Sequence, residues 1–211
     1  NRAERPLDPK TIITKLRDRT EEKVAASSKS TNKLEFDFWN DESPIYSSVE
    51  LDSCTTCGAC VEECPMSIEH LDLILNLKRY KALTLGDLPP AAADAANKVR
   101  VNGNPWGISQ DDRMKWADGI DVPIAKEGEK IDYLYYVGCA GSYDASNQKV
   151  VQDTVKLLMK AGVQFAVMGK TEKCNGDPIR RFGDEYTFTE IAIENIANMR
   201  KYSFDKVVTH C

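Results

Sequence analysis

Residues 54–65 read Cys54-Thr55-Thr56-Cys57-Gly58-Ala59-Cys60-Val61-Glu62-Glu63-Cys64-Pro65. This is the run C-x-x-C-x-x-C-x-x-x-C-P, whose thiolates bind [4Fe–4S] clusters. Three sulfurs bind one cluster, and in two-cluster ferredoxins the fourth binds the other cluster. Gly58 permits the unusual backbone angles needed close to such a centre, and Pro65 suits the first turn of a following helix. The run predicts cluster ligands at Cys54, Cys57, Cys60 and Cys64.

Two other interpretations of these cysteines are a structural zinc site and a disulfide framework. A zinc site usually takes its four ligands from two separated pairs, whereas this run has four cysteines within eleven residues. The chain has seven cysteines, and their grouping for metal binding indicates a reducing compartment rather than a secreted disulfide scaffold. The iron–sulfur interpretation is therefore preferred.

The composition is that of an ordinary globular protein. The 211 residues are 42% hydrophobic and 29% charged, with a formal net charge of −5. The acidic balance argues against binding to nucleic acid, which favours a basic surface. No apolar stretch approaches the roughly 20 residues needed to cross a bilayer. The length allows one large or two small domains.

The fourth cysteine of the run lacks partners in this sequence. If Cys64 binds a second cluster, that cluster needs three more cysteines in a matching run, and the sequence contains no such run. The chain also begins without methionine and stops at Cys211. We therefore expect it to be an internal piece of a longer polypeptide.

The first part of the chain is predicted to be a helical module over 1–105. Helices are expected over 9–26 and 65–82, and from Asp87 to the turn at 102–105. The polar stretch 27–53 is expected to be a surface loop. Its apolar residues are expected to pack against the helices: Phe36, Phe38, Trp39, Ile45 and Tyr46. Residues 106–130 are interpreted as a linker with one short helix over 109–117.

The last part, 131–211, is predicted to be an α/β domain. Strands are expected over 132–137, 164–168 and 206–210, and helices over 146–161 and 185–202. This alternation predicts a βαβαβ parallel sheet. The fold class is therefore α+β overall, with a helical dicluster-ferredoxin-like module followed by an α/β cysteine-rich domain.

The three remaining cysteines each follow one predicted strand. They are Cys139, Cys174 and Cys211. Ligands gather beyond the carboxyl ends of parallel strands, so the three thiols are expected to converge. The alternative is three unrelated buried cysteines, which are common in protein cores. We favour a ligand role, and since three ligands are short of four, we expect a further cysteine beyond Cys211.

These residues resemble the cysteine-rich (CCG-domain) iron–sulfur oxidoreductases related to the catalytic part of heterodisulfide reductase. The resemblance covers nearly the whole chain and is carried by the motifs 53–65 with Ile68-Glu69-His70, Gly103-Asn104-Pro105-Trp106-Gly107, 137–144 and Cys174-Asn175-Gly176-Asp177-Pro178. The ferredoxin run alone is generic, and its combination with the later motifs is more specific. The chain is most similar to the membrane-bound branch linked to electron-transfer flavoprotein, which passes electrons from acyl-CoA oxidation to menaquinone.

The resemblance implies cofactors, partners and location. Cys54, Cys57 and Cys60 would bind one [4Fe–4S] cluster, and Cys64 a second cluster that shares an upstream cysteine run. Cys139, Cys174 and Cys211 would bind the cluster of the α/β domain, with a C-x-x-C pair beginning at Cys211. Haem is implied only in a membrane domain further upstream. The implied partners are electron-transfer flavoprotein or another flavoprotein donor and a quinone, at the cytoplasmic side of the cell membrane.

The chain departs from the family at Asn175. The namesake motif has two adjacent cysteines before glycine, whereas this sequence has Cys174-Asn175-Gly176. The noncubane cluster of heterodisulfide reductase relies on the extra thiolate, so disulfide reduction is not expected here.

Three alternatives to an electron relay from flavoprotein to menaquinone are considered: a heterodisulfide reductase-like protein, an iron–sulfur subunit for 2-hydroxy acids or glycerol 3-phosphate, and a structural metal-binding protein without redox activity.

Other polar residues near the motifs have simpler interpretations than metal binding. Asp144 and Asp177 are expected to cap helices or form turns. His70 is expected to cap a helix or form a salt bridge, and His210 to end a strand. The tyrosines of the first strand are expected to belong to the core rather than to a quinone site.

Overall fold

The computed structural model of the chain describes residues 6–27 and 44–210. The chain forms two compact units. The first contains the described residues up to Gly86 together with Arg181–Gly183, and the second contains Asp87–Arg180 and the described residues from Asp184 onward. Helices and one parallel sheet confirm the predicted α+β class. The predictions for Phe36, Phe38, Trp39 and Cys211 lie outside the described residues.

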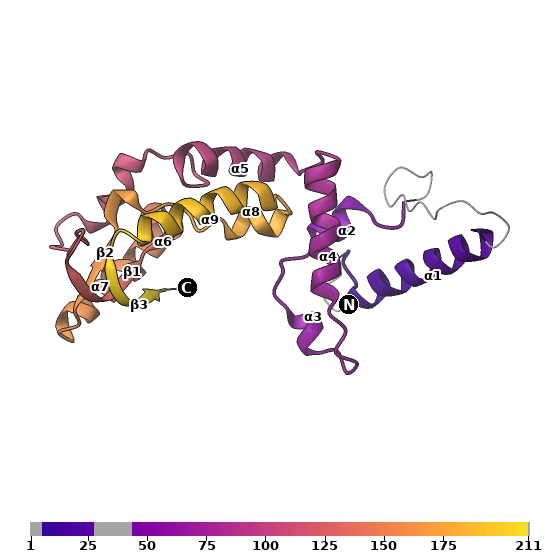
Figure 1. Ribbon diagram of the computed structural model, residues 1–211, viewed down its shortest axis with the longest axis horizontal. Coiled ribbons are helices and arrows are strands. Elements are labelled where there is room, and N and C mark those ends of the chain that lie inside the picture. Colours follow the sequence, from indigo (N-terminus) through magenta and orange to yellow (C-terminus); the bar gives the residue numbers. More distant parts are fainter. Residues whose placement is uncertain (1–5, 28–43, 211) are drawn as a thin grey trace. The chain divides into compact units, whose positions relative to one another are not determined.

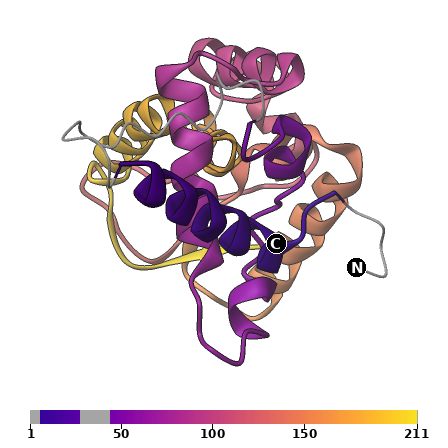
Figure 2. The same ribbon diagram turned by 90° about the vertical axis from the view of Figure 1, so that its right-hand side faces the viewer.

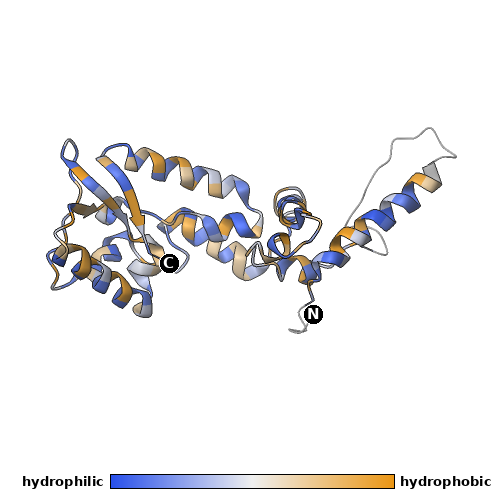
Figure 3. Cartoon of the chain, turned by 90° about the horizontal axis from the view of Figure 1, so that it is seen from below, coloured by the Kyte–Doolittle hydropathy of each residue, from blue (hydrophilic) through white to orange (hydrophobic). Residues whose placement is uncertain are grey.

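The first unit is helical. It contains α1 (Pro9–Ser27), α2 (Ser48–Asp52), α3 (Ala59–Glu62), α4 (His70–Arg79) and a π-helical turn at Tyr80–Thr84. The helix predicted over 9–26 is confirmed as α1. Asp8 caps its start, since its Oδ1 accepts a hydrogen bond from Lys10 N at 3.1 Å. Hydrophilic residues occupy much of α1 (Figure 3), so the helix buries only a narrow apolar stripe.

The core of the first unit lies between α1, α2 and α4. It consists of Ile12, Ile45, Tyr46, Leu51, Ile74 and Leu77. Figure 2 shows α1 crossing α4, and Ile12 and Ile74 are fully buried there. The Tyr46 hydroxyl donates to Ile12 O at 2.9 Å, which anchors the ring. The predicted packing of Ile45 and Tyr46 against the helices is confirmed.

The helix predicted over 65–82 begins later than expected. It starts at His70 and continues from Arg79 into the π-helical turn. Ser67 has a φ of 53°, a left-handed conformation that cannot continue a right-handed helix. Pro65 therefore does not open α4, and the loop that carries Cys64 extends to Glu69.

The second unit is built on a three-stranded parallel sheet. Its elements are α5 (Pro90–Asn102), a 3-10 helix at Gln110–Ala117, β1 (Lys130–Tyr136), α6 (Gly138–Tyr143), α7 (Ala145–Lys160), β2 (Phe165–Val167), a 3-10 turn at Gly169–Thr171, α8 (Asp177–Phe182), α9 (Glu185–Met199) and β3 (Ser203–Thr209). The strand order is β2-β1-β3, with Leu134 of β1 paired with Ala166 and Val207. The predicted parallel sheet is confirmed.

Helices cover both faces of this sheet. On one face, Tyr135 packs with Val151 and Val155 of α7. On the other face, Leu134 and Tyr136 belong to a cluster against which Met199 of α9 packs. Successive strand residues point to opposite faces, so β1 is buried on both sides. Figure 1 shows α5 running beside α9 on the outside of the unit.

Residues 106–130, interpreted from the sequence as a linker, contribute to the second unit. Trp116 and Val122 belong to the core cluster under α7. Ala125 N donates to Val167 O at 2.9 Å, which places this stretch along the free edge of β2. The predicted short helix is confirmed as the 3-10 helix at Gln110–Ala117. The Gly and Pro content of this stretch indicated a linker, but its apolar side chains pack into the core of the second unit.

Candidate iron–sulfur sites

The cysteine run forms the connection between α2 and α4 in the first unit. Cys54 follows α2, Cys60 lies in α3, and Cys64 comes just after α3. Cys57 is exposed, whereas the other three thiols are half-buried. The backbone is left-handed at Thr56, with a φ of 55°, and at Gly58, with a φ of 77°. The predicted need for glycine at position 58 is therefore met.

Backbone N–H groups point at the sulfurs of this run. Thr56 N donates to Cys54 Sγ at 3.4 Å, and Ile68 N donates to Cys64 Sγ at 3.4 Å. Hydrogen bonds to the sulfurs are among the features by which proteins set the potential of iron–sulfur clusters. These donors suit thiolates better than neutral thiols, because a charged acceptor strengthens the bond. The geometry of the run therefore fits an iron–sulfur cluster.

The thiols of the run lie close enough to influence one another. Burial raises the pKa of Cys60, and the charges of Cys54 and Cys57 raise it further. The pKa of Cys57 is lowered, mainly by the backbone N–H of Ala59. A cluster that holds these sulfurs as thiolates would need positive charge nearby to offset them.

Lys78 of α4 supplies such a charge next to the run. Its side chain is 3% exposed, and Nζ donates to Cys54 O at 2.8 Å and to Arg181 O at 3.2 Å. Burial lowers the pKa of Lys78, and the charge of Cys54 opposes the shift. Arg181 Nη1 donates to Thr55 O at 2.8 Å. Two cationic side chains thus hold the backbone at the first cysteine of the run.

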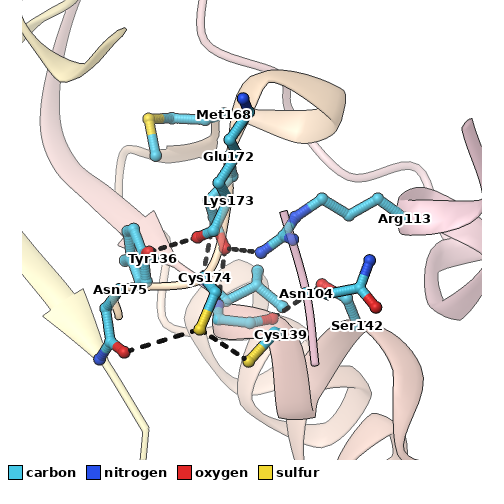
Figure 4. Close-up of polar contacts among 12 residues, drawn as sticks. Asn104, Arg113, Tyr136, Cys139, Ser142, Met168, Glu172, Lys173, Cys174 and Asn175 are labelled. Atoms are coloured by element: carbon cyan, nitrogen blue, oxygen red, sulfur yellow. Dashed lines mark hydrogen bonds and ion pairs between the residues drawn. The ribbon is translucent and has the colours of Figure 1, made fainter. Parts of the chain in front are cut away.

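In the second unit, two of the three predicted ligands meet. Cys139 is the second residue of α6, directly after β1, and Cys174 lies between the 3-10 turn and α8. Their sulfur atoms are 3.5 Å apart (Figure 4). Gly176 N donates to Cys174 Sγ at 3.5 Å. The predicted convergence is confirmed for this pair, and Cys211 lies outside the described residues.

The two thiols are not equivalent. The hydrogen bond with Cys139 lowers the pKa of Cys174 to about 7, and Gly176 N contributes to the shift. The same hydrogen bond, together with burial, raises the pKa of Cys139. The contact between the two sulfurs therefore favours Cys174 as the thiol that loses its proton first, with Cys139 as the donor.

A buried ion pair connects the two loops that carry these cysteines. Arg113 Nη2 lies 2.5 Å from Glu172 Oε1, and both side chains are 1% exposed (Figure 4). The Glu172 carboxylate also accepts from Val137 N at 3.1 Å and from Gly138 N at 2.6 Å. Burial raises the pKa of Glu172, and the Arg113 guanidinium opposes this. Glu172 therefore ties the start of the Cys139 loop to the segment leading into Cys174.

One guanidinium nitrogen of Arg113, Nη1, is buried without a hydrogen-bond acceptor among the described residues. The charge of Arg113 also lowers the pKa values of Cys139 and Cys174, although the hydrogen bond between the two thiols and their burial shift these values more. A buried, partly unsatisfied cation close to two thiols fits an anionic group such as a thiolate-bound cluster.

A cavity of about 360 Å³ opens beside Cys139. Asn175 and His210 are among its lining residues. Asn175 Oδ1 lies 4.0 Å from Cys174 Sγ and accepts from Asp177 N at 3.0 Å, so the residue that replaces the second cysteine forms a turn. His210 Nδ1 lies 2.9 Å from the Tyr135 hydroxyl. Within 6–27 and 44–210, no three histidine, cysteine or acidic side chains are arranged to hold a single metal ion.

The remaining polar predictions have mixed outcomes. Asp144 caps α7 as expected, since its side chain accepts from Ser146 N and Asn147 N. His70 begins α4 and is 5% exposed, and in the described part of the chain its Nδ1 has no hydrogen-bond partner. Tyr135 and Tyr136 are buried core residues, as predicted.

Sequence reasoning missed three residues that shape the two sites: Lys78, Arg113 and Glu172. Each is a charged residue in a segment that reads as an ordinary solvated helix or loop. The available signal was weak, because Lys78 follows Ile74 and Leu77 on the apolar side of α4 and Glu172 precedes Cys174 by two positions. Their partners lie far away in sequence, so only the folded chain identifies them.

A family comparison matches the second part of the chain. The family model described as a cysteine-rich domain, CCG, matches residues 133–211. That range contains Cys139, Cys174 and Cys211 and begins within β1. No solved structure matches the chain significantly.

Curated relatives cover most of the chain. A probable iron–sulfur-binding oxidoreductase, FadF, of Bacillus subtilis is 40% identical over 172 residues, which is 78% of this chain and 24% of the relative. A probable membrane-anchored ferredoxin of Chromohalobacter salexigens is 40% identical over 74% of this chain and 23% of the relative. An EtfAB:quinone oxidoreductase of Syntrophomonas wolfei is 34% identical over 88% of this chain and 26% of the relative.

The chain spans about a quarter of the length of these relatives. By name, one is an iron–sulfur-binding oxidoreductase, one a ferredoxin and one a quinone oxidoreductase. One of them is named as membrane-anchored. In the part of the present chain that the structure describes, no helix combines the length and the apolar character needed to span a bilayer.

Proposed function

Because residues 133–211 match the CCG cysteine-rich domain family and the relatives of the chain include an iron–sulfur-binding oxidoreductase and a quinone oxidoreductase, we propose that this chain is the electron-transfer core of an iron–sulfur oxidoreductase. In this proposal it carries electrons from a flavoprotein donor through [4Fe–4S] clusters toward a membrane quinone. The observation that carries the proposal is the cysteine run in which backbone N–H groups of Thr56 and Ile68 already point at Cys54 and Cys64.

The ligand assignment follows the sequence. Cys54, Cys57 and Cys60 bind one cluster, and Cys64 binds a second cluster whose other ligands lie outside this chain. Cys139, Cys174 and Cys211 bind a cluster in the cysteine-rich domain. When bound, such clusters accept and release single electrons at potentials between roughly −700 and +450 mV. The residues of the chain set the ligand positions and the charge around each site.

The donor and acceptor are proposed from the relatives. The relative named EtfAB:quinone oxidoreductase supports electron-transfer flavoprotein as the donor and a quinone, menaquinone in this proposal, as the acceptor. In the overall reaction, the reduced flavin is oxidised and the quinone takes up two electrons and two protons. The membrane-anchored relative supports a position at a membrane, and in this proposal the chain lies on the cytoplasmic side of the cell membrane.

The contacts in the second unit favour one further candidate, thiol–disulfide chemistry in the cysteine-rich domain. The 3.5 Å separation of the Cys139 and Cys174 sulfurs is the observation in its favour. Asn175 stands where the additional thiolate of heterodisulfide reductase would be, and this argues for the relay. A change in the electron paramagnetic resonance (EPR) signal of this domain on adding a disulfide substrate would support the candidate.

The relay is tested with Cys57→Ser in the complete protein that contains this chain. We expect a lower iron and sulfide content, loss of the signal of the cluster bound by Cys54, Cys57 and Cys60, and interrupted electron flow from reduced flavoprotein to quinone. Val61→Ala, a change of a half-buried residue on α3 that binds no metal, is the matched control and should retain all three. Unchanged iron content and an unchanged signal in Cys57→Ser would contradict the assignment.

A further inference from the structure

Lys78 is a buried cation whose position is fixed from two sides. It lies on α4 in the first unit, and its Nζ donates to Cys54 O at 2.8 Å and to Arg181 O at 3.2 Å. The side chain is 3% exposed. A buried ammonium is costly unless nearby negative charge compensates it, so its placement calls for a source of that charge.

The hydrogen bonds of Lys78 do not supply the compensating charge. Both of its acceptors among the described residues are neutral carbonyl oxygens. Lys81, one turn later on the same stretch and equally buried, differs because its Nζ lies 2.9 Å from the Asp52 carboxylate. Two neighbouring buried lysines thus have different partners. Lys81 is paired directly with Asp52, whereas Lys78 donates to the backbone of Cys54. Burial lowers the pKa of Lys78, and the charges of Cys54 and, after it, Asp52 oppose this shift without a direct ion pair.

The surrounding backbone is built to keep Lys78 in place. Arg181 Nη1 donates to Thr55 O at 2.8 Å, so the segment that accepts from Lys78 is itself held to the cysteine run. Gly183 approaches α4 so closely that a Cβ atom would lie 2.4 Å from Lys78 O. Its φ of 98° is one that residues with side chains rarely adopt. The two carbonyl groups that accept from Lys78 are therefore held in place beside α4.

We propose that Lys78 is the built-in counter-ion of the cluster held by Cys54, Cys57 and Cys60, and that its charge raises the reduction potential of that cluster. The inference rests on the proposed function, since it requires that these thiolates hold a cluster. Reduction adds one negative charge to a thiolate-bound centre, and a fixed cation beside a ligand favours the reduced form. Lys78 also positions Cys54 through its carbonyl.

The test is an EPR-monitored redox titration of the complete, cluster-loaded protein. Lys78→Gln keeps a donor for a carbonyl oxygen and removes the charge, Lys78→Met removes both, and Lys78→Arg keeps the charge. We expect the equilibrium constant for one-electron reduction to fall at least about tenfold in the glutamine and methionine variants, a shift of about 59 mV to lower potential. The arginine variant should stay within about a factor of three of the wild type.

The matched control removes the neighbouring buried ion pair. Asp52→Asn with Lys81→Met removes one acid and one base, so the net charge near the run is unchanged. The equilibrium constant for one-electron reduction should therefore change by less than about threefold. Iron content, measured alongside, separates loss of the cluster from a change in its potential.

Three outcomes would overturn the inference. The first is a wild-type potential in Lys78→Gln, and the second is an equal shift in the Asp52/Lys81 control. The third is loss of the cluster from all three Lys78 variants, because the arginine variant keeps the charge. If the wild-type protein itself shows no cluster signal that depends on Cys57, the proposed function fails instead, and the two failures are distinguishable.

Discussion

The ion pair between Arg113 and Glu172 should hold both cysteine loops of the second unit in place. Removing one partner of a buried pair leaves the other charge uncompensated and costs about 3–5 kcal/mol. We therefore expect Arg113→Met and Glu172→Gln each to lower the free energy of local opening by about that amount. Val137 N and Gly138 N donate to different oxygens of the Glu172 carboxylate, so the single amide oxygen of Glu172→Gln replaces only one of these acceptors, and the expected loss combines the ion pair with one backbone hydrogen bond.

The double variant makes the prediction specific to the pair. Once Arg113 is gone, Glu172→Gln no longer breaks an ion pair and instead removes an unpaired buried carboxylate. The double variant should therefore be at least about 2 kcal/mol more stable than the sum of the single changes implies.

Native-state amide hydrogen exchange of the segment 137–143 in the complete protein measures this locally. Because 1.4 kcal/mol is a factor of about ten, each single variant should exchange at least about a hundredfold faster. If the effects of the two single variants add to within about 0.5 kcal/mol in the double variant, Arg113 and Glu172 are energetically independent and do not form the proposed stabilising pair.

Two further predictions concern the backbone and the pH dependence. Gly183→Ala should release the segment Arg181–Gly183 from α4 and speed amide exchange there, because the new Cβ would lie 2.4 Å from Lys78 O. The control is Gly119→Ala, where φ is 79° and no described atom lies close to the added Cβ, and its effect on exchange should be smaller. Equal effects of the two substitutions would contradict the role of the close contact. The pKa of Asp144 is lowered from its usual value of 3.8, mainly by the N–H of Asn147. The unfolded chain therefore binds the proton more readily than the folded chain. The stability that this cap contributes is lost as the pH falls below the usual pKa of the carboxyl group and through its lowered value. Asp144→Asn should remove this acid-range dependence from the exchange of the first turn of α7, and a dependence that persists would show that another group is responsible.

The sequence predicted the parts of the fold that depend on local pattern. The cysteine run, the helices at Pro9–Ser27 and Ala145–Lys160 and the parallel sheet follow from spacing and periodicity. The convergence of Cys139 and Cys174 followed from the rule that ligands gather at the carboxyl ends of parallel strands.

The parts that the sequence did not predict depend on contacts between distant residues. The pairing of Arg113 with Glu172 joins positions 59 residues apart, and Lys78 reaches Arg181 across 103 residues. The late start of α4 depends on the left-handed backbone at Ser67, which proline propensity at position 65 did not indicate. The composition of 106–130 is typical of a linker and did not indicate that Trp116 packs in the core, because its neighbours there lie elsewhere in the sequence.

The central claim is that electrons pass through the cluster bound by Cys54, Cys57 and Cys60. The most direct measurement mixes the complete protein with reduced electron-transfer flavoprotein, freezes the reaction at successive times and records EPR spectra of wild type and Cys57→Ser. We expect a cluster signal to appear in the wild type no more slowly than quinone is reduced, and we expect both the signal and quinone reduction to be absent from the variant. Quinone reduction at the wild-type rate by Cys57→Ser without that signal would show that electrons bypass this cluster.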